Sequence, residues 1–184
     1  MNALCGVLGK CDPAMVKAMA NAMKHRGEAR TIVEGKDYAF AASVPVENPP
    51  CIADGIPRNA QGGVVGPADL ARMCASLRDP SQLALKGMFA AVVSVNGRWW
   101  LIRDRLGAKP LYYTIRDSAL LFASELKGLL ASGCVPKQLN PLAIDQFLTL
   151  RCVPGPHSIF EGVERVRPGC VVEFCNGRVS ETTF

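Results

Sequence analysis

Two apolar runs on either side of an Asn-Gly dipeptide constrain the fold of this chain more than any other feature. MFAAVVSV precedes Asn96-Gly97, and RWWLIRD follows it. Asn-Gly is the dipeptide that best fits a two-residue type I′ turn, which joins antiparallel strands. A second Asn-Gly, at Asn176-Gly177, lies within another apolar stretch and predicts a further hairpin. Antiparallel sheet is therefore expected.

Shorter patterns predict helices and additional strands. Leu4–Leu8 is a short apolar strand, Asp12 and Pro13 are an N-cap and first helical residue, and Asn140-Pro141 begin another helix. The other expected elements are a strand pair over 30–46, helices over 67–77 and 125–130, strands at 111–114 and 119–123, and an irregular segment over 48–66 that is rich in proline and glycine. Together they predict an α+β fold in which helices cover two stacked, mostly antiparallel sheets.

Composition limits the classes of protein that fit. The 184 residues are 49% hydrophobic, which is enough for one core, so a single domain over residues 1–184 is expected. The 21 basic and 16 acidic residues are scattered, which does not suggest nucleic-acid binding, and no apolar run approaches the roughly 18 residues of a membrane span. The eight cysteines form no C-x-x-C pair, which favours a reduced, cytoplasmic protein without a disulfide framework.

Several segments carry a resemblance to a known family. RDRLGAKPLYY at 103–113, followed by FASELKGLL at 122–130, resembles the paired signature of asparagine synthetase N-terminal domains, which are class II glutamine amidotransferases. CGVLG at 5–9, HRG at 25–27, LKGMFAAVV at 85–93 and the segment 153–172 agree with the same family. Each segment taken alone also fits a structural role, because its apolar positions fill a sheet and its glycines and prolines form turns.

The resemblance implies a four-layer αββα sandwich of the N-terminal nucleophile hydrolase kind. Such domains release ammonia from glutamine and pass it to an ATP-using synthetase domain. This sequence contains no S-G-G-x-D-S motif for ATP binding, so the expected partner is a separate ATP-dependent synthetase chain. No cofactor is expected, and with two histidines in the chain neither is a histidine-based metal site.

The family resemblance assigns the nucleophile to Cys5. In these enzymes the cysteine is the first residue of the mature chain, and its own α-amino group acts through water as the base for the thiol. Here the Cys5 nitrogen is tied in a peptide bond to Leu4. Glutaminase activity by this mechanism therefore requires removal of Met1–Leu4, and the uncut chain is expected to be a poor glutaminase.

Other residues that face glutamine in relatives are displaced or absent. The arginine that binds the substrate α-carboxylate has no counterpart, because no arginine or lysine occurs between Lys36 and Arg58. The relatives' N-G-E-I-Y-N segment, which stabilises the oxyanion, is placed on 61–73, where Gly63 keeps only a backbone N–H. Losing one such donor typically costs about 10²- to 10³-fold in rate. Arg26 and Gly27 are the expected substrate-binding residues of the pocket wall, although Gly27 also suits a helix C-cap.

Three hypotheses remain open from the sequence. The first is a glutaminase subunit that becomes active when the chain is cut before Cys5. The second is a non-catalytic interaction or scaffold domain that partners a separate synthetase chain, with an uncut N-terminus and a shallow or filled pocket beside Cys5. In the third, the altered pocket binds another small amine or amide.

Overall fold

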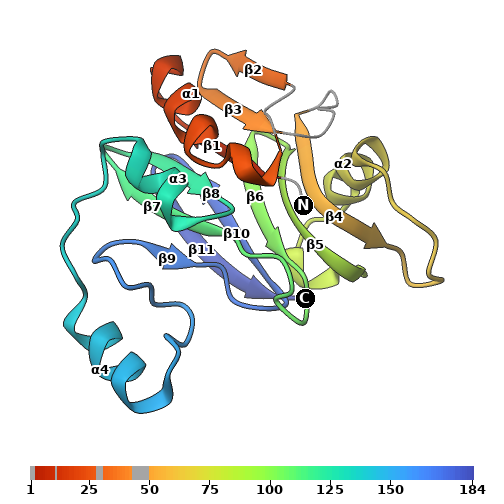
Figure 1. Cartoon of the computed structure of the whole chain (residues 1–184). Coiled ribbons are helices and arrows are strands. Elements are labelled where there is room, and N and C mark those ends of the chain that lie inside the picture. The colour runs from red at the N-terminus through yellow and green to blue at the C-terminus, as the bar shows by residue number, and fades with distance from the viewer. Residues whose placement is uncertain (1–2, 11, 28–30, 43–49) are drawn as a thin grey trace.

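Two antiparallel sheets lie face to face at the centre of the molecule, with helices against their outer surfaces (Figure 1). The computed structural model describes residues 3–10, 12–27, 31–42 and 50–184. Arg30 and residues 43–46 of the expected strand pair lie outside these ranges, but its hairpin is present, and the turn at residues 36–37 falls within the expected turn of 34–37.

The first sheet has six strands, and the N-terminal strand lies inside it. In spatial order the strands are β2 (Thr31–Gly35), β3 (Tyr38–Ala42), β1 (Leu4–Leu8), β8 (Ala119–Ala123), β7 (Tyr112–Arg116) and β9 (Glu164–Arg165). Neighbouring strands are antiparallel, and β1 pairs with both β3 and β8. The short strand β9 carries no sequence signal and was not predicted.

The second sheet has five strands and contains both Asn-Gly hairpins. Its spatial order is β11 (Arg178–Thr183), β10 (Cys170–Cys175), β6 (Arg98–Arg103), β5 (Lys86–Val95) and β4 (Cys51–Arg58). Asn96 and Gly97 have φ values of 49° and 79°, and Asn176 and Gly177 have 49° and 76°. Positive φ at both central residues is what a type I′ turn requires, so both hairpin predictions are confirmed.

Helices cover the outside of each sheet and complete the expected four layers. The helical segments are α1 (Pro13–Ala22), the 3-10 turn η1 (Lys24–Arg26), α2 (Pro67–Ser76), the 3-10 turn η2 (Pro80–Gln82), α3 (Leu126–Ala131) and α4 (Pro141–Leu150). α1 and α3 pack on the first sheet, and α2 packs on the second. Asp12 and Asn140 cap α1 and α4 through their side chains, as the sequence predicts.

Separate apolar cores lie between the sheets and under each helical layer. Leu4, Phe40 and Phe122 belong to the core between the sheets, whereas Cys5 belongs to the core beneath α1 and α3. Adjacent residues of a strand point to opposite faces, so Leu4 and Cys5 necessarily enter different layers. The α+β, αββα architecture is therefore confirmed.

The prediction of an irregular segment over 48–66 is wrong for its central part. Cys51–Arg58 forms β4, which pairs with β5 along its whole length. β4 is an edge strand, and an edge tolerates Pro57 because the missing N–H can face away from the ladder. Gly55 has φ +100°, and a Cβ there would lie 2.1 Å from the Met88 carbonyl oxygen, so the glycine that suggested a loop instead permits a close strand approach.

Candidate functional site

Cys5 lies within β1 and is almost completely buried. It pairs with Ala41 on one side and Ala123 on the other, and it is 1% exposed. Burial raises the pKa of the Cys5 thiol to about 12, although a hydrogen bond from the Ala41 backbone opposes this rise. A thiol with this pKa is protonated at neutral pH and is a weak nucleophile.

The cavity beside Cys5 is too small for an amino acid. Its volume is about 10 Å³, which is room for about one water molecule. Its walls come from β1, β3, α1 and the end of η1, and the lining residues are Ala3, Cys5, Ala20, Met23, Gly27, Ala41 and Ala42. Cys5 and Gly27 are thus brought together as the family pattern implies, but around a gap that is too small for glutamine.

The peptide bond before Cys5 is held inside the sheet. The Leu4 N–H donates to Ser124 Oγ at 3.1 Å, and the Ser124 N–H donates to the Leu4 carbonyl oxygen at 2.9 Å. Leu4 is 0% exposed and pairs with Ala42. Proteolytic cutting favours exposed, mobile chain, so the bond between Leu4 and Cys5 is poorly placed for scission in the folded state.

A cluster of charged side chains connects three of the family motifs. We call His25, Arg26, Asp54, Lys109, Glu125 and Lys127 the charged cluster. At its centre the Asp54 carboxylate forms ion pairs with Arg26 Nη2, at 3.3 Å, and with Lys109 Nζ, at 2.9 Å. The Arg26 and Asp54 side chains are 7% and 1% exposed. These pairs join the HRG segment to the RDRLGAKPLYY segment through the edge strand β4.

Glu125 forms the second centre of the charged cluster. Arg26 Nη1 and His25 Nε2 each lie 3.1 Å from Glu125 Oε1, and Lys127 Nζ lies 3.3 Å from Oε2. Burial alone would raise the pKa of the Glu125 carboxyl, but the hydrogen bonds from Arg26, His25 and Lys127 together lower it below its usual value. Arg26 therefore bridges the carboxylate of Asp54 on β4 and that of Glu125, which directly precedes α3.

The RDRLGAKP loop is organised by its own first two side chains. Asp104 is fully buried and accepts hydrogen bonds from the N–H groups of Leu106, Ala108 and Lys109, at 3.0 to 3.1 Å. The Arg103 guanidinium donates to the carbonyl oxygens of Lys109, Val166 and Gly107. Both charged residues thus fix the loop backbone that carries Lys109 to Asp54.

The predicted site residues do not converge on one centre. Arg26 turns toward Asp54 and Glu125 and does not line the cavity beside Cys5. Gly27 lines that cavity and also caps η1, where its N–H donates to the Lys24 carbonyl at 3.0 Å. Gly63 lies on an exposed turn, and its N–H already donates to Asn59 Oδ1 at 2.9 Å. The structure therefore brings Gly27 to Cys5 but not Gly63.

Sequence reasoning missed Asp54, Lys109 and Glu125 as members of a common cluster. A signal was present for Asp54, since it is the only acidic residue in the apolar stretch CIADGIP. An acid in such a stretch is buried only when it is paired. Its partners lie 28 and 55 positions away along the chain, and no local pattern identifies them.

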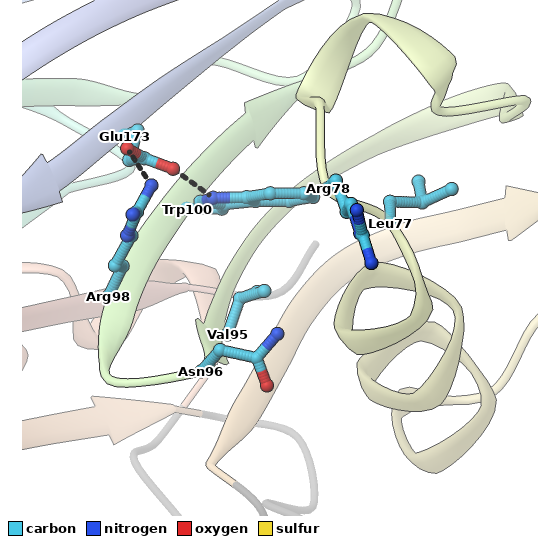
Figure 2. Close-up of a pocket in the computed structure, with 7 residues that line it drawn as sticks. All are labelled: Leu77, Arg78, Val95, Asn96, Arg98, Trp100 and Glu173. Carbon is cyan, nitrogen blue, oxygen red and sulfur yellow. Dashed lines mark hydrogen bonds and ion pairs between the residues drawn. The ribbon is translucent and has the colours of Figure 1, made fainter.

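Another hollow lies on the outer side of the second sheet (Figure 2). It has a volume of about 300 Å³, and Trp100 forms one wall. Trp100 Nε1 donates to Glu173 Oε2 at 2.9 Å, and Arg98 Nη1 donates to Glu173 Oε1 at 3.0 Å. These polar groups already form hydrogen bonds with one another. The exposed Arg78 is therefore the main charged group that the hollow could present to a ligand.

The described residues contain neither a metal-binding cluster nor a membrane-spanning helix. Within these residues no group of three or more His, Cys, Asp or Glu side chains is arranged to hold a metal ion. None of the helices in the same part of the chain has the length and hydropathy needed to cross a bilayer.

Comparison with known families now identifies the chain. Residues 76–184, more than half of the sequence, match the model of the glutamine amidotransferase domain. The chain belongs to this glutamine amidotransferase family. The matched region includes the RDRLGAKPLYY loop and Glu125, whereas Cys5 and Arg26 lie outside it.

Several curated proteins are similar to part of this amidotransferase domain. Amidase chry2 of Gibberella zeae is 41% identical over 87 residues, which are 46% of this chain and 12% of that protein. Asparagine synthetase [glutamine-hydrolyzing] 3 of Bacillus subtilis is 34% identical over 93 residues, 49% of this chain and 15% of that protein. A putative asparagine synthetase of Methanocaldococcus jannaschii is 34% identical over 87 residues, which are 40% of this chain and 17% of that protein. The chain thus spans less than a fifth of these relatives.

Solved structures support the fold of the amidotransferase domain. The glutamine phosphoribosylpyrophosphate amidotransferase of B. subtilis superposes with a TM-score of 0.60 at 12% identity, over 98% of this chain and 49% of that one. A structure described as the allosteric regulatory enzyme of purine biosynthesis superposes with a TM-score of 0.62 at 13% identity. The match covers 98% of this chain and 48% of that one. At this identity the likeness concerns the fold alone, and it confirms the α+β sandwich of two antiparallel sheets.

Proposed function

We propose that this glutamine amidotransferase domain does not hydrolyse glutamine and acts as a folded, non-catalytic partner of a separate ATP-dependent synthetase chain. One observation carries the proposal: Cys5 lies in mid-strand, with Leu4 built into the core in front of it. The features that relatives use for folding are retained, while those that would face glutamine are closed or replaced.

The nucleophile of the family mechanism lacks its base in this setting. The Cys5 nitrogen is an amide, which cannot accept the thiol proton. The raised thiol pKa disfavours the reactive thiolate, and the cavity of about 10 Å³ leaves no space for the carboxamide of glutamine next to the sulfur. Activity would require cutting a buried peptide bond and opening this gap.

The oxyanion site is also altered under this proposal. The segment DGIPRN at 54–59 shares the glycine and the last asparagine of the relatives' N-G-E-I-Y-N segment, so Asp54 and Gly55, rather than Gly62 and Gly63, take the place of the asparagine and glycine. An ionised carboxylate has no proton to donate, and its charge would repel an oxyanion. Asp54 instead pairs with Arg26 and Lys109.

The family of the relatives supports a synthetase as the partner. Two of the relatives are named glutamine-hydrolysing asparagine synthetases, and the region shared with this chain is only 15% and 17% of their length. A domain of this kind is therefore found joined to a much larger remainder. The charged cluster would keep the three motifs in fixed positions for such a partner without performing chemistry.

Ammonia release from glutamine tests the loss of activity. We would compare the whole chain, a chain that begins at Cys5, and the Cys5→Ala variant of each, together with the intact mass of the purified protein. We expect an uncut chain and no ammonia above the Cys5→Ala background in any form. Turnover by the trimmed chain that disappears in its Cys5→Ala variant would refute the proposal.

A second candidate function has one specific observation in its favour. Gly27 and Cys5 line the same cavity, which is the arrangement expected if the pocket once held, or still opens to hold, glutamine. In that case scission before Cys5 would free its α-amino group and produce a working glutaminase subunit. A mass loss corresponding to Met1–Leu4 in protein from the native host would favour this function.

A further inference from the structure

The helix α4 stands apart from the rest of the molecule. Figure 1 shows it on an arm between α3 and β9, away from both sheets. No other described helix or strand packs extensively against it. Only Ala143 of its ten residues is buried. Within the described chain this helix therefore has no partner for most of its surface.

The composition of α4 does not suit a helix in water. Its sequence, PLAIDQFLTL, contains a single charged residue, Asp145. Leu142, Phe147, Leu148 and Leu150 are 50%, 51%, 75% and 56% exposed. A helix that is apolar around most of its circumference is normally buried, and clustered exposed apolar residues mark interaction sites. Something outside the described chain is therefore expected to cover it.

The arm is held in a defined place by its base. The Asn140 N–H donates to the Ile159 carbonyl and the Glu161 N–H to the Gln138 carbonyl, each at 2.9 Å. An isolated bridge between Leu139 and Phe160 lies between these two bonds. These bonds close the base of the arm where the chain leaves the body of the domain.

A hollow of about 440 Å³ lies at the foot of this arm, against the first sheet. Its walls are mainly apolar and include Tyr112, Leu126, Val153, Pro154 and Ile159, with Arg165 among them. Two buried side-chain atoms in the described chain lack a hydrogen-bond partner, Gln146 Oε1 on α4 and Arg165 Nε beside this hollow.

We propose that α4 and the hollow at its foot form the docking surface for the ATP-dependent synthetase chain. This inference rests on the proposed function, and it assigns the partner to particular residues. The much longer relatives indicate a large folded partner, which is what an apolar helix and an adjoining hollow require. The partner is expected to supply an apolar groove for Phe147 and Leu148.

Site-specific cross-linking identifies what covers α4. The photoreactive residue benzoylphenylalanine would replace Leu148 in the full chain, expressed in the organism that encodes it, and mass spectrometry would identify the attached peptide. Met88, which is 61% exposed on β5, provides the matched control position. We expect adducts with a synthetase from Leu148 and none from Met88. Adducts with a second copy of this chain, adducts with an unrelated protein, or no adduct would overturn the proposal.

Charged substitutions then test the surface quantitatively. Because central apolar anchors dominate interface energies, Phe147→Asp and Leu148→Asp should each weaken binding of the cross-linked synthetase at least 10-fold, with no loss of thermal stability. Met88→Asp should leave the affinity unchanged. Equal affinity for all three variants would refute the role of α4.

The two proposals fail in different ways. Glutamine turnover by the trimmed chain, with the Leu148 adduct still formed, would remove the claim of lost activity and leave the docking surface intact. If neither turnover nor the Leu148 adduct is observed, the docking surface is refuted and the claim of lost activity stands.

Discussion

A chain that begins at Cys5 is expected to be severely destabilised, because Leu4 belongs to the structure and not to a disposable leader. Leu4 is 0% exposed in the core between the sheets, and losing a buried leucine side chain costs about 2–5 kcal/mol. Its two hydrogen bonds with Ser124 add about 0.5–1.5 kcal/mol each. The sum, roughly 3–8 kcal/mol, is comparable with the whole stability of a typical domain, about 5–15 kcal/mol.

Urea unfolding followed by circular dichroism measures this effect. A chain that begins at Ala3 is the matched control, since it keeps Leu4 and both hydrogen bonds. The full-length Leu4→Ala variant isolates the side chain and should lose about 2–5 kcal/mol. If the chains beginning at Ala3 and Cys5 unfold at the same urea concentration, Leu4 does not anchor β1 and the argument against processing before Cys5 fails.

Three further outcomes follow from the burial of charged and thiol groups. Arg26→Ala should cost about 1.5–3 kcal/mol in urea unfolding because it removes one of the two cations that pair with buried Asp54, whereas Arg72→Ala, at an exposed ion pair, should change stability by less than about 1 kcal/mol; equal losses would contradict this. Iodoacetamide at pH 8 should label exposed Cys152 in the folded protein and Cys5 only after denaturation, as peptide mass mapping would reveal. Burial raises the thiol pKa values of Cys5 and Cys74 from 9.0 to about 12, so the folded state retains protons that the unfolded state releases: the contribution of these thiols to stability should be unchanged below about pH 9, stability should fall as the pH rises from 9 toward 12, and a flat profile over that range would refute the shifts.

Much of the fold follows from local chemistry. The two Asn-Gly turns and the caps at Asp12 and Asn140 are set by a few adjacent residues, so the hairpins and helix starts were predicted close to their observed positions. β4 was missed because its proline and glycine read as loop residues. Only its position at the sheet edge, and the close approach of Gly55 to Met88, make them compatible with a strand.

The candidate site was less predictable than the fold. The period of a strand places Leu4 and Cys5 on opposite faces, but it does not say which face meets the helices, and that choice decides whether the thiol is buried beneath α1. Asp54 and Glu125 obtain their shared partner, Arg26, from another part of the chain. Such long-range pairing depends on the strand order of both sheets, which no local pattern encodes.

The closed base of the α4 arm has a consequence for how such a domain changes over time. Because the Asn140–Ile159 and Gln138–Glu161 bonds close the base of the arm, α4 itself can vary in length or sequence without disturbing strand pairing in the sandwich. The arm can therefore change while the two-sheet fold stays the same. Related chains that bind different partner proteins are expected to differ mainly in this arm. Transferring the arm to a homologous domain should transfer the binding preference with it.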